Sequence, residues 1–308
     1  MGAGRYAPSP SGELHVGNLR TAVLAWLFAR STGRDFLLRV EDLDRARAGA
    51  EELQLADLRA IGIDWDGPAV RQSERPEGYR AAIDALEAAG LLYECFCTRR
   101  DIAEAPSAPH AAPGAYPGTC RGLGRAERAS RRATRPAALR LRTDVVQFTI
   151  TDVLHGEYTG VVDDFVVVRN DGVPAYNLAV VVDDALQGID QVVRGDDLLP
   201  STPRQGYLAT LLSGLAGDFH GTELPEYGHV PLVLNDQGRR LAKRDGSVTL
   251  AQLDHDGVPP PRVRSLLLES LGLPGGPLAA ALDSFDPAGL PLEPWVFGGF
   301  TADTPGMQ

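Results

Sequence analysis

His15 lies in a segment whose residue types suit the binding of a phosphate group. The segment reads Pro8-Ser-Pro-Ser-Gly-Glu-Leu-His15-Val-Gly17-Asn18 and leads into a helical pattern. The free N–H groups and the positive dipole end at a helix start bind anions. A histidine there can donate a hydrogen bond as charge develops on a phosphate oxygen, and Gly17 allows a ligand to approach the backbone. The alternative is a loop histidine that only lies beside a helix cap.

Lys243 is the only lysine among the 30 basic residues of the chain. It follows Leu241 and Ala242 and precedes Arg244. An ammonium on a flexible stem can follow a phosphate through a reaction, whereas arginine carries a planar, rigid fork. The location makes Lys243 a second candidate for phosphate chemistry. The alternative is codon bias that removes lysine elsewhere, and composition alone favours it.

All three cysteines of the chain lie in one stretch, at Cys95, Cys97 and Cys120. A close pair with a third, more distant thiol is typical of a metal site, whereas a disulfide is not expected in a cytoplasmic protein. Three thiolates leave the fourth position of a tetrahedral zinc site open, and ligand chemistry alone would favour His110 for it. The alternative is three reduced, buried cysteines without a metal.

Composition and charge limit the class of protein. The 308 residues suffice for one large α/β domain or two smaller ones. No apolar run approaches the ~18 residues of a membrane span, and no secretory signal is recognisable, so we expect a cytoplasmic protein. The net charge of −11 argues against a general nucleic-acid binder. The arginine-rich stretch 121–142 is nevertheless a candidate for RNA contact, with a solvated basic face as the alternative.

The predicted elements place these residues on an alternating α/β framework. A strand over 4–7, a helix over 18–30 and a near-continuous apolar strand over 36–40 form one βαβ unit. Further helices are expected over 51–61, 77–89 and 203–215. Further strands are expected over 91–97, 138–142, 146–151 and 161–169, and the apolar runs 176–183 and 191–194 look buried. Residues 98–136 read as an insertion, and the tail from Pro294 is expected to be weakly ordered.

Several blocks of the sequence together resemble the class I aminoacyl-tRNA synthetases in their glutamyl form. The segments Arg5-Tyr-Ala-Pro-Ser-Pro-Ser-Gly and His15-Val-Gly-Asn18 are similar to the nucleotide-binding signature of that family. Leu241-Ala242-Lys243-Arg244 is similar to its lysine loop, with Ala242 where the family usually has a serine. Blocks around Glu41, Tyr176 and Arg194 match in the same order, so the resemblance covers residues 4 to 250.

The resemblance implies a Rossmann-type parallel-sheet catalytic domain that activates L-glutamate with ATP and Mg²⁺. His15 and Lys243 would be catalytic and would stabilise the charge on the reacting phosphates. Contacts to ATP are implied for these two and for Pro8, Gly17, Asn18, Leu241 and Arg244. Contacts to glutamate are implied for Arg5, Tyr6, Ala7, Ser9, Glu41, Tyr176 and Arg194.

The residue chemistry agrees with a site for an acidic amino acid. Such a ligand needs a guanidinium for each carboxylate and a carboxylate for its ammonium. By the resemblance, Arg5 and Arg194 would face the carboxylates, and Glu41 would take the ammonium. The alternative for Arg194 and Glu41 is a structural ion pair.

The resemblance also gives the cysteines a specific role. The pattern Cys95-x-Cys97 followed by Tyr116-x3-Cys120 is similar to the zinc knuckle of glutamyl-type enzymes. It implies one Zn²⁺ per chain, with Tyr116 as the fourth ligand and His110 as the alternative.

The segment after the lysine loop distinguishes two branches of the family. Enzymes that charge tRNA(Glu) carry a large helical anticodon-binding domain there, whereas this segment is short and has no basic residue beyond Arg264. The branch built without that domain attaches glutamate to the queuosine base at the wobble position of tRNA(Asp), and the resemblance implies this reaction. The alternatives are a truncated enzyme that charges the 3′ end of tRNA(Glu) and a non-catalytic paralogue.

We therefore expect four regions along the chain. They are the first half of the Rossmann catalytic domain over 1–94, an insertion with the zinc knuckle over 95–170, the second half over 171–245, and a short C-terminal segment over 246–308 without an anticodon-binding domain. The expected partners are ATP, L-glutamate and queuosine-bearing tRNA(Asp). The protein is expected to act as a monomer, with no membrane partner.

Overall fold

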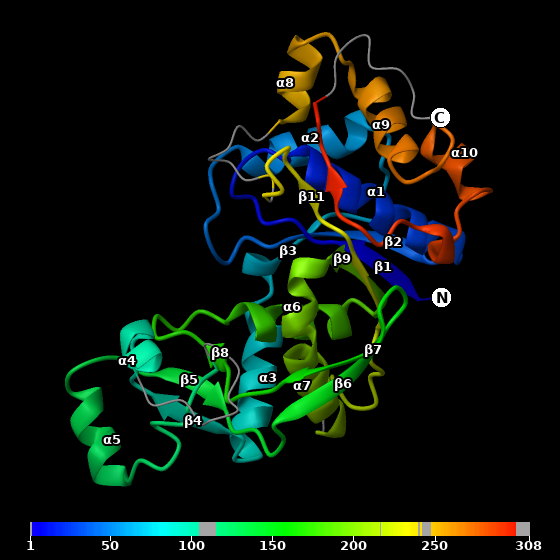
Figure 1. The fold of residues 1–308 in the computed structure, drawn as a ribbon. Helices are drawn as coiled ribbons and strands as arrows, with labels where there is room; N and C mark the ends of the chain where they lie inside the picture. Colours follow the sequence, from blue (N-terminus) through cyan, green and yellow to red (C-terminus); the bar gives the residue numbers. More distant parts are fainter. Residues whose placement is uncertain (1, 105–114, 216, 240, 242–247, 300–308) are drawn as a thin grey trace.

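A seven-stranded sheet forms the centre of the computed structural model, which describes residues 2–104, 115–215, 217–239, 241 and 248–299 (Figure 1). The strand order is β3-β2-β1-β9-β10-β6-β7, and all neighbours are parallel except the β6–β7 hairpin. The strands are β1 (Ala3–Tyr6), β2 (Asp35–Val40), β3 (Val70–Arg71), β6 (Gln147–Asp152), β7 (Gly156–Val161), β9 (Ile189–Gly195) and β10 (Glu226–Val230). The expected α/β fold with a mainly parallel sheet is confirmed.

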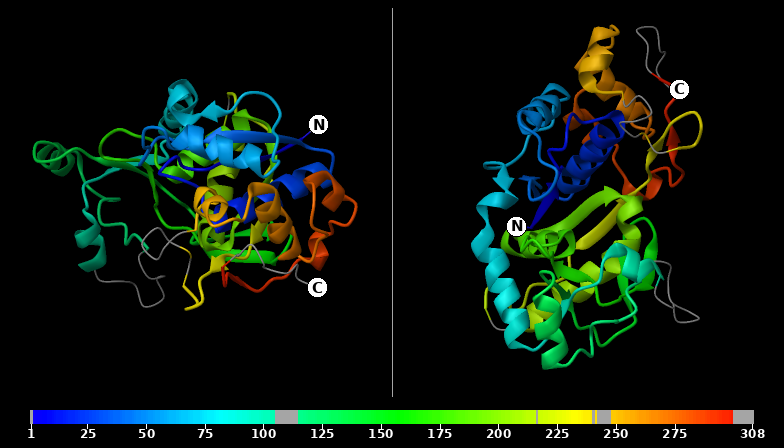
Figure 2. Two further views of the ribbon diagram at one scale, coloured as in Figure 1. Left: turned by 90° about the horizontal axis from the view of Figure 1, so that it is seen from above. Right: turned by 90° about the vertical axis from the view of Figure 1, so that its left-hand side faces the viewer.

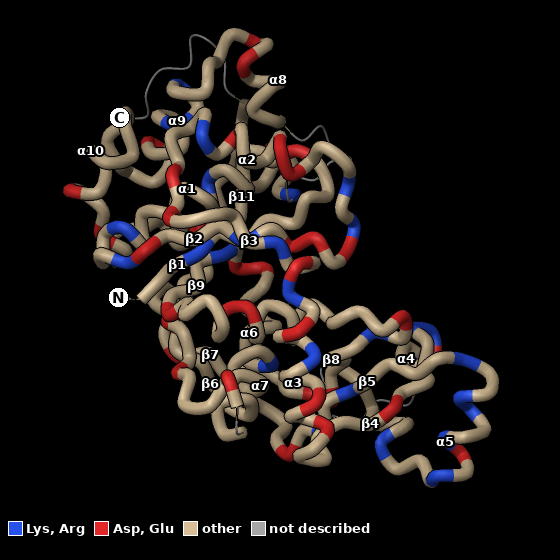
Figure 3. Tube along the Cα trace, turned by 180° about the vertical axis from the view of Figure 1, so that it is seen from behind, with Lys and Arg blue, Asp and Glu red and all other residues tan. Residues whose placement is uncertain are grey.

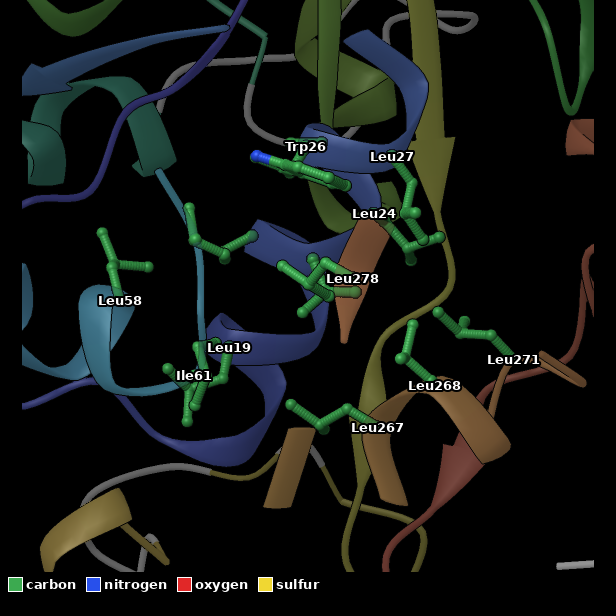
Figure 4. Close-up of a cluster of buried hydrophobic side chains, with 14 of the residues drawn as sticks. Leu19, Leu24, Trp26, Leu27, Leu58, Ile61, Leu267, Leu268, Leu271 and Leu278 are labelled. Atoms are coloured by element: carbon green, nitrogen blue, oxygen red, sulfur yellow. The ribbon is translucent and has the colours of Figure 1, made fainter. Parts of the chain in front are cut away.

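Helix α1 (Val16–Ser31) joins β1 to β2 and is apolar on all sides, with every residue from Ala22 to Ala29 buried. A helix of this kind must be covered on both sides. The sheet covers one side, and α2 (Ala50–Ala60), α9 (Pro260–Glu269) and α10 (Leu278–Leu282) cover the other. Figure 4 shows leucines of α1 among side chains from these helices. The predicted helices over 18–30 and 51–61 are confirmed.

Helices α3 (Pro76–Ala88), α6 (Tyr176–Leu186) and α7 (Thr202–Gly214) form a second apolar cluster with the strands behind them. Successive strand residues point to opposite faces of the sheet. Leu38 and Val193 accordingly pack in the α1 cluster, and Leu37 and Val192 pack on the opposite side. Figure 2 shows, in two further views, the helices that lie on the two sides of the central sheet.

A smaller antiparallel sheet holds the cysteine-rich part of the chain. It consists of β4 (Leu92–Cys95), β5 (Ala138–Leu141) and β8 (Val166–Val168), and α4 (Arg99–Glu104) and α5 (Arg125–Arg132) belong to the same part of the chain. Figure 1 shows this part projecting from the central sheet. Strands β6 and β7 lie within the expected insertion range 95–170 but complete the central sheet.

Two predicted elements differ from the structure. The expected strand 161–169 is divided, because Val161 ends β7 and only Val166–Val168 forms β8. Between them, Asp163 and Asp164 accept hydrogen bonds from several segments, which ends the strand. The apolar run 176–183 is buried from Leu178 to Asp183, but it is helical, and Tyr176 is 43% exposed.

The C-terminal part packs against α1 and the end of the sheet. It contains α8 (Leu250–His255), α9, α10 and the parallel pair β11 (Val233–Leu234) and β12 (Trp295–Val296). The expectation of a weakly ordered tail from Pro294 is wrong for residues 295–297, because β12 pairs with β11 and Phe297 is buried. A Pro- and Gly-rich composition does not reveal such long-range pairing. Short 3-10 turns are η1 (Gln72–Glu74), η2 (Asp196–Ser201) and η4 (Pro287–Gly289). None of the described helices is long and apolar enough to cross a bilayer.

Candidate functional site

A cavity of about 510 Å³ lies beyond the carboxyl ends of the adjacent strands β1 and β9. The chain passes from β1 to β2 on one side and returns to β9 on the other, and ligands of open α/β sheets bind at such a switch point. Most of the residues predicted for the ATP and glutamate sites line it. They are Tyr6, Ala7, Pro8, Ser9, His15, Gly17, Asn18, Glu41, Tyr176 and Arg194.

His15 is the N-cap of α1. Its Nδ1 accepts hydrogen bonds from the backbone N–H groups of Gly17 at 3.1 Å and Asn18 at 3.3 Å, and Asn18 Oδ1 accepts from the His15 N–H at 3.2 Å. This reciprocal arrangement is a capping box. Because Nδ1 is an acceptor, the proton of the neutral ring lies on Nε2, which makes Nε2 a hydrogen-bond donor.

Gly17 has a second role that the sequence did not reveal. A Cβ at this position would lie 3.1 Å from Cε1 and 3.2 Å from Nδ1 of His15. A side chain would therefore press on the imidazole ring. The absence of a side chain at Gly17 therefore lets the His15 ring keep its position and also leaves the start of α1 open to a ligand.

Glu41 follows β2 and lies near a cluster of buried charges. Arg39, which is fully buried, places Nη2 at 3.7 Å from Glu41 Oε1 and Nη1 at 2.7 Å from Asp184 Oδ1. Burial raises the pKa of Glu41 above its usual value, and Arg39 and Arg5 offset only part of this effect. A cation that binds at Glu41 would favour its ionised form.

Arg5 lies deeper than the sequence suggested. Its Nε donates to Asp184 Oδ1 at 3.2 Å, its side chain is only 4% exposed, and it is not among the residues that line the cavity. Burial by itself would raise the pKa of Asp184, but Arg39 and Arg5 outweigh it and hold that pKa below its usual value. Asp184 thus links two arginines behind the cavity wall.

Three polar side chains surround this charge cluster. The Ser9 hydroxyl donates to the backbone carbonyl of Glu41, and the Tyr6 hydroxyl donates to that of Asn18, each at 3.2 Å. Tyr176, the first residue of α6, lies where the charges of Arg194, Glu41 and Arg5 all act on its hydroxyl. The side chains predicted for glutamate binding are therefore brought together.

Arg194 is held by neutral groups. Its Nε donates to His229 Nε2 at 3.1 Å, and its Nη2 donates to Thr202 Oγ1 at 2.8 Å and Gln205 Oε1 at 2.6 Å. Among the described residues, no carboxylate lies within ion-pair distance of Arg194, so the suggested pair with Glu41 is absent. His229, Thr202 and Gln205 were missed, because they are 8 to 35 residues away and share no local motif with it.

The lysine-loop residues Lys243, Arg244 and Ala242 lie outside the described residues, but both flanks of the loop are placed. Leu241 lines a cavity of about 340 Å³ together with Pro8, His15 and Asn18. On the other flank, Val248 O accepts from Val16 N at 3.1 Å, and Thr249 forms a bridge with His15. The loop therefore leaves and rejoins the fold at the start of α1.

The three cysteines form a cluster that could hold a metal ion, because their sulfur atoms lie within 4.8 Å of one another. The Tyr116 hydroxyl is 3.3 Å from Cys95 Sγ and 3.7 Å from Cys97 Sγ. Burial opposes ionisation of Cys95, but the Tyr116 hydrogen bond and Arg140 outweigh it, so the pKa of this thiol is lowered. His110 lies outside the described residues.

Most arginines of the stretch 121–142 stabilise the fold around this cluster. Arg132 binds Glu94, Arg121 binds Asp164, and Arg140 stacks on the Tyr116 ring at 3.6 Å. Arg131, Arg135 and Arg142 also have partners. Among the arginines of this stretch, all of which the structure describes, only Arg125 and Arg128 of α5 form no side-chain hydrogen bond, ion pair or ring contact, and Figure 3 shows the positive charge of this helix.

A second cavity of about 970 Å³ shares Ser9, Glu41, Arg45 and Tyr176 with the first. It extends to Cys95 and Cys97, so it connects the charge cluster to the cysteine cluster. Four arginines line it: Arg45, Arg99, Arg135 and Arg169. Arg45 is also the only described non-glycine residue with a positive φ, at 56°.

Comparisons with known proteins agree with this arrangement. The family model described as "tRNA synthetases class I (E and Q), catalytic domain" matches residues 3–279. A glutamyl-Q tRNA(Asp) synthetase of Nocardia farcinica is 66% identical over 96% of this chain and 93% of its own length. The one of Symbiobacterium thermophilum is 46% identical over 96% of this chain and 95% of its own length.

Solved structures are similar as well. The chain is similar to a glutamate tRNA ligase from Elizabethkingia meningosepticum, solved in complex with its amino acid. The TM-score is 0.77 and the identity 26%, with coverage of 96% of this chain and 67% of that chain.

Proposed function

Because the chain belongs to the class I tRNA synthetase family for glutamate and glutamine and is a ligase, we propose that it activates L-glutamate with ATP and transfers the glutamyl group to tRNA(Asp). The acceptor in this proposal is a hydroxyl of the queuosine base at the wobble position. We also propose that it acts as a cytoplasmic monomer.

The observation that carries the activation step is the meeting of four side chains around one cavity. Glu41 offers a carboxylate for the substrate ammonium, and Arg194 offers a guanidinium that no described carboxylate neutralises. Tyr176 adds a hydroxyl, and His15 at the start of α1 lies on the same cavity. An amino acid and the phosphates of ATP would therefore lie next to each other.

In the proposed first step, an oxygen of the α-carboxylate of glutamate attacks the α-phosphate of ATP, and pyrophosphate leaves. The product is glutamyl-adenylate. His15 Nε2–H and Lys243 would stabilise the added negative charge, since phosphoryl transfer depends chiefly on positioning and charge stabilisation. ATP would bring Mg²⁺ with it.

In the second step, the queuosine hydroxyl attacks the acyl carbon, its proton passes to a phosphate oxygen of the departing AMP, and AMP leaves with the bonding electrons. The second cavity supports this step, because it opens onto Glu41 and Tyr176 and is lined by Arg99, which has no ion pair among the described residues and can face an RNA phosphate. A flexible anticodon loop can present an unstacked base to such a cavity.

Relatives named for the queuosine reaction favour tRNA(Asp) over tRNA(Glu). The Nocardia farcinica relative is matched over 93% of its length, whereas the glutamate tRNA ligase chain is matched over only 67%. The proposal therefore ranks transfer to the base above charging of a 3′ end. A non-catalytic paralogue is disfavoured because His15, Glu41 and Arg194 all line one cavity.

The acceptor is tested with labelled glutamate and two preparations of the same tRNA(Asp), one with queuosine and one with guanosine at the wobble position. We expect labelling of the queuosine-containing tRNA only. Nuclease digestion of the labelled tRNA at mildly acidic pH should release the label on the wobble nucleoside and not on the 3′-terminal adenosine.

tRNA(Glu) serves as the control acceptor in the same assay. Labelling of tRNA(Glu) at its 3′ end would favour the truncated enzyme instead. Absence of glutamate-dependent pyrophosphate exchange would favour the non-catalytic paralogue.

We also propose one Zn²⁺ per chain, bound by Cys95, Cys97, Cys120 and Tyr116. The donor set supports this, because three sulfur atoms converge with one phenol oxygen beside them, and a structural zinc ion takes four ligands in a tetrahedron. The bound ion would stabilise the small sheet and α5, since ligands from distant segments would be joined. It is not assigned a part in the reaction.

Purified protein is expected to contain about one zinc ion per chain by elemental analysis. Cys120→Ser should lose it, and Tyr116→Phe should bind it roughly 10–100-fold more weakly in chelator competition. Tyr158→Phe, on β7, is the matched control and should bind as the wild type does.

A His110→Ala variant distinguishes the two candidates for the fourth ligand. It should keep the metal affinity of the wild type. If His110→Ala loses zinc while Tyr116→Phe keeps it, the assignment of Tyr116 is wrong.

A further inference from the structure

A row of side chains behind Arg194 crosses three neighbouring strands. The sheet order places β10 between β9 and β6. Arg194 on β9 pairs in register with His229 on β10, and Tyr227 on β10 pairs with Asp152 at the end of β6. His229 is fully buried and Asp152 is 2% exposed. The row therefore leads from the cavity into the interior of the sheet.

The hydrogen bonds along this row all run toward Asp152: Arg194 donates to His229, and His229 donates to Asp152. Asp152 Oδ2 lies 2.6 Å from His229 Nδ1 and also accepts from the His229 backbone N–H at 3.0 Å. Asp152 Oδ1 accepts from the backbone N–H groups of Leu154 at 2.9 Å and His155 at 3.0 Å. With its carboxylate acting only as acceptor, the proton between Asp152 and His229 belongs to Nδ1.

The Nε2 atom of His229 must then be an acceptor. It receives the N–H of Arg194 Nε at 3.1 Å and lies 2.9 Å from the Thr202 hydroxyl, and an added proton on Nε2 would be set against the Arg194 N–H. Burial and the charge of Arg194 lower the pKa of His229, which agrees with a neutral ring. The hydrogen bond from His229 helps to hold the pKa of Asp152 low in spite of burial. Asp152 thus selects the Nδ1–H tautomer.

Arg194 differs from the other two buried arginines of the site in the charge of its partners. Arg5 and Arg39 each contact Asp184, which neutralises much of their charge. Arg194 is instead held by an imidazole, a hydroxyl and an amide, so it keeps its charge for a ligand. Among the described residues its hydrogen bonds use Nε and Nη2, which leaves the Nη1 edge for the cavity that Arg194 lines.

We propose that His229 and Asp152 are positioning residues that fix Arg194, through a neutral imidazole of one tautomer, to bind a carboxylate of the amino-acid substrate. This inference rests on the proposed function, in which that substrate is L-glutamate. Neither residue touches the substrate. Both act by holding the Arg194 guanidinium at one angle without neutralising it.

The test is steady-state glutamate-dependent pyrophosphate exchange with the full chain. His229→Asn keeps a group near the Nδ1 position but is too short to reach Arg194 Nε. It should raise the KM for glutamate roughly 10–100-fold, the effect of losing one hydrogen bond to a charged group, and leave the KM for ATP unchanged. His229→Gln places its amide oxygen near the Nε2 position and should restore most of the affinity for glutamate.

Asp152→Asn is the second variant, and it changes almost no volume. Its amide can donate to Nδ1, which would move the ring proton to Nε2 and set it against Arg194 Nε–H. The same rise in the KM for glutamate is expected, again with the KM for ATP unchanged. Thermal unfolding measured by circular dichroism identifies any variant that fails to fold. The KM values of the folded variants then decide whether His229 and Asp152 position Arg194.

Two exposed residues supply matched controls. His220→Asn and Asp171→Asn make the same chemical changes far from the row and should exchange as the wild type does. If folded His229→Asn and Asp152→Asn keep the wild-type KM for glutamate, or raise both KM values equally, the inference is overturned. Absence of exchange in the wild type would instead refute the proposed function.

Discussion

Lys243→Arg is expected to lower glutamate-dependent pyrophosphate exchange by about 10²–10³-fold, the usual effect of removing one group that stabilises transition-state charge. The formal charge is kept, so the loss would come from shape. An ammonium can follow the moving phosphate on its flexible stem, whereas the guanidinium is wider and rigid. The measurement is the exchange of labelled pyrophosphate into ATP at saturating glutamate.

The described flanks of the loop support this expectation. Leu241 shares a cavity with His15, and Val248 and Thr249 contact Val16 and His15. Lys243 lies two residues after Leu241, so its side chain is within reach of the same helix start.

Arg239→Lys is the matched control. It replaces an arginine by a lysine just before the loop, which is the reverse of the Lys243→Arg change. Arg239 is exposed, and its backbone N–H bonds to Asn235. This variant should exchange pyrophosphate at the wild-type rate. Wild-type exchange by Lys243→Arg would show that the lysine has no special part in activation.

His15→Asn is expected to lower the same exchange by about 10²–10³-fold while the protein keeps its stability. Asparagine is among the best N-cap residues, and its Oδ1 can accept from Gly17 and Asn18 as Nδ1 of His15 does. The variant has no counterpart of Nε2–H. It therefore separates the capping of α1 from the proposed donation to a phosphate oxygen.

His15→Ala provides the comparison, since it removes the cap as well. It should lose about 1 kcal/mol in the free energy of unfolding, measured in urea, in addition to the loss of exchange. If His15→Asn is as active as the wild type, the histidine acts only as a cap. That result would support the simpler interpretation of a loop histidine at a helix start.

Local chemistry was readable from the sequence wherever a function needs only neighbouring residues. The loop from Pro8 to Asn18, the first βαβ unit and the cysteine pattern each lie within a short segment, and the structure places their residues together. Helix α6 could not be predicted in this way. The apolar run 176–183 indicates burial but not helix, because the helical form depends on packing against α3 and α7.

The sequence by itself determined that this chain has an α/β fold with a nucleotide-type loop before α1, a candidate lysine loop and a thiol cluster. Only the tertiary structure decided which charges are neutralised. Arg5 and Asp184 are 179 residues apart, and His229 and Asp152 are 77 apart, so no local pattern could pair them. Parallel strands bring such residues side by side at one edge of the sheet, because each crossover returns the chain to the same end. Strand order therefore decides that Arg194 lies beside the neutral His229 and not beside a carboxylate.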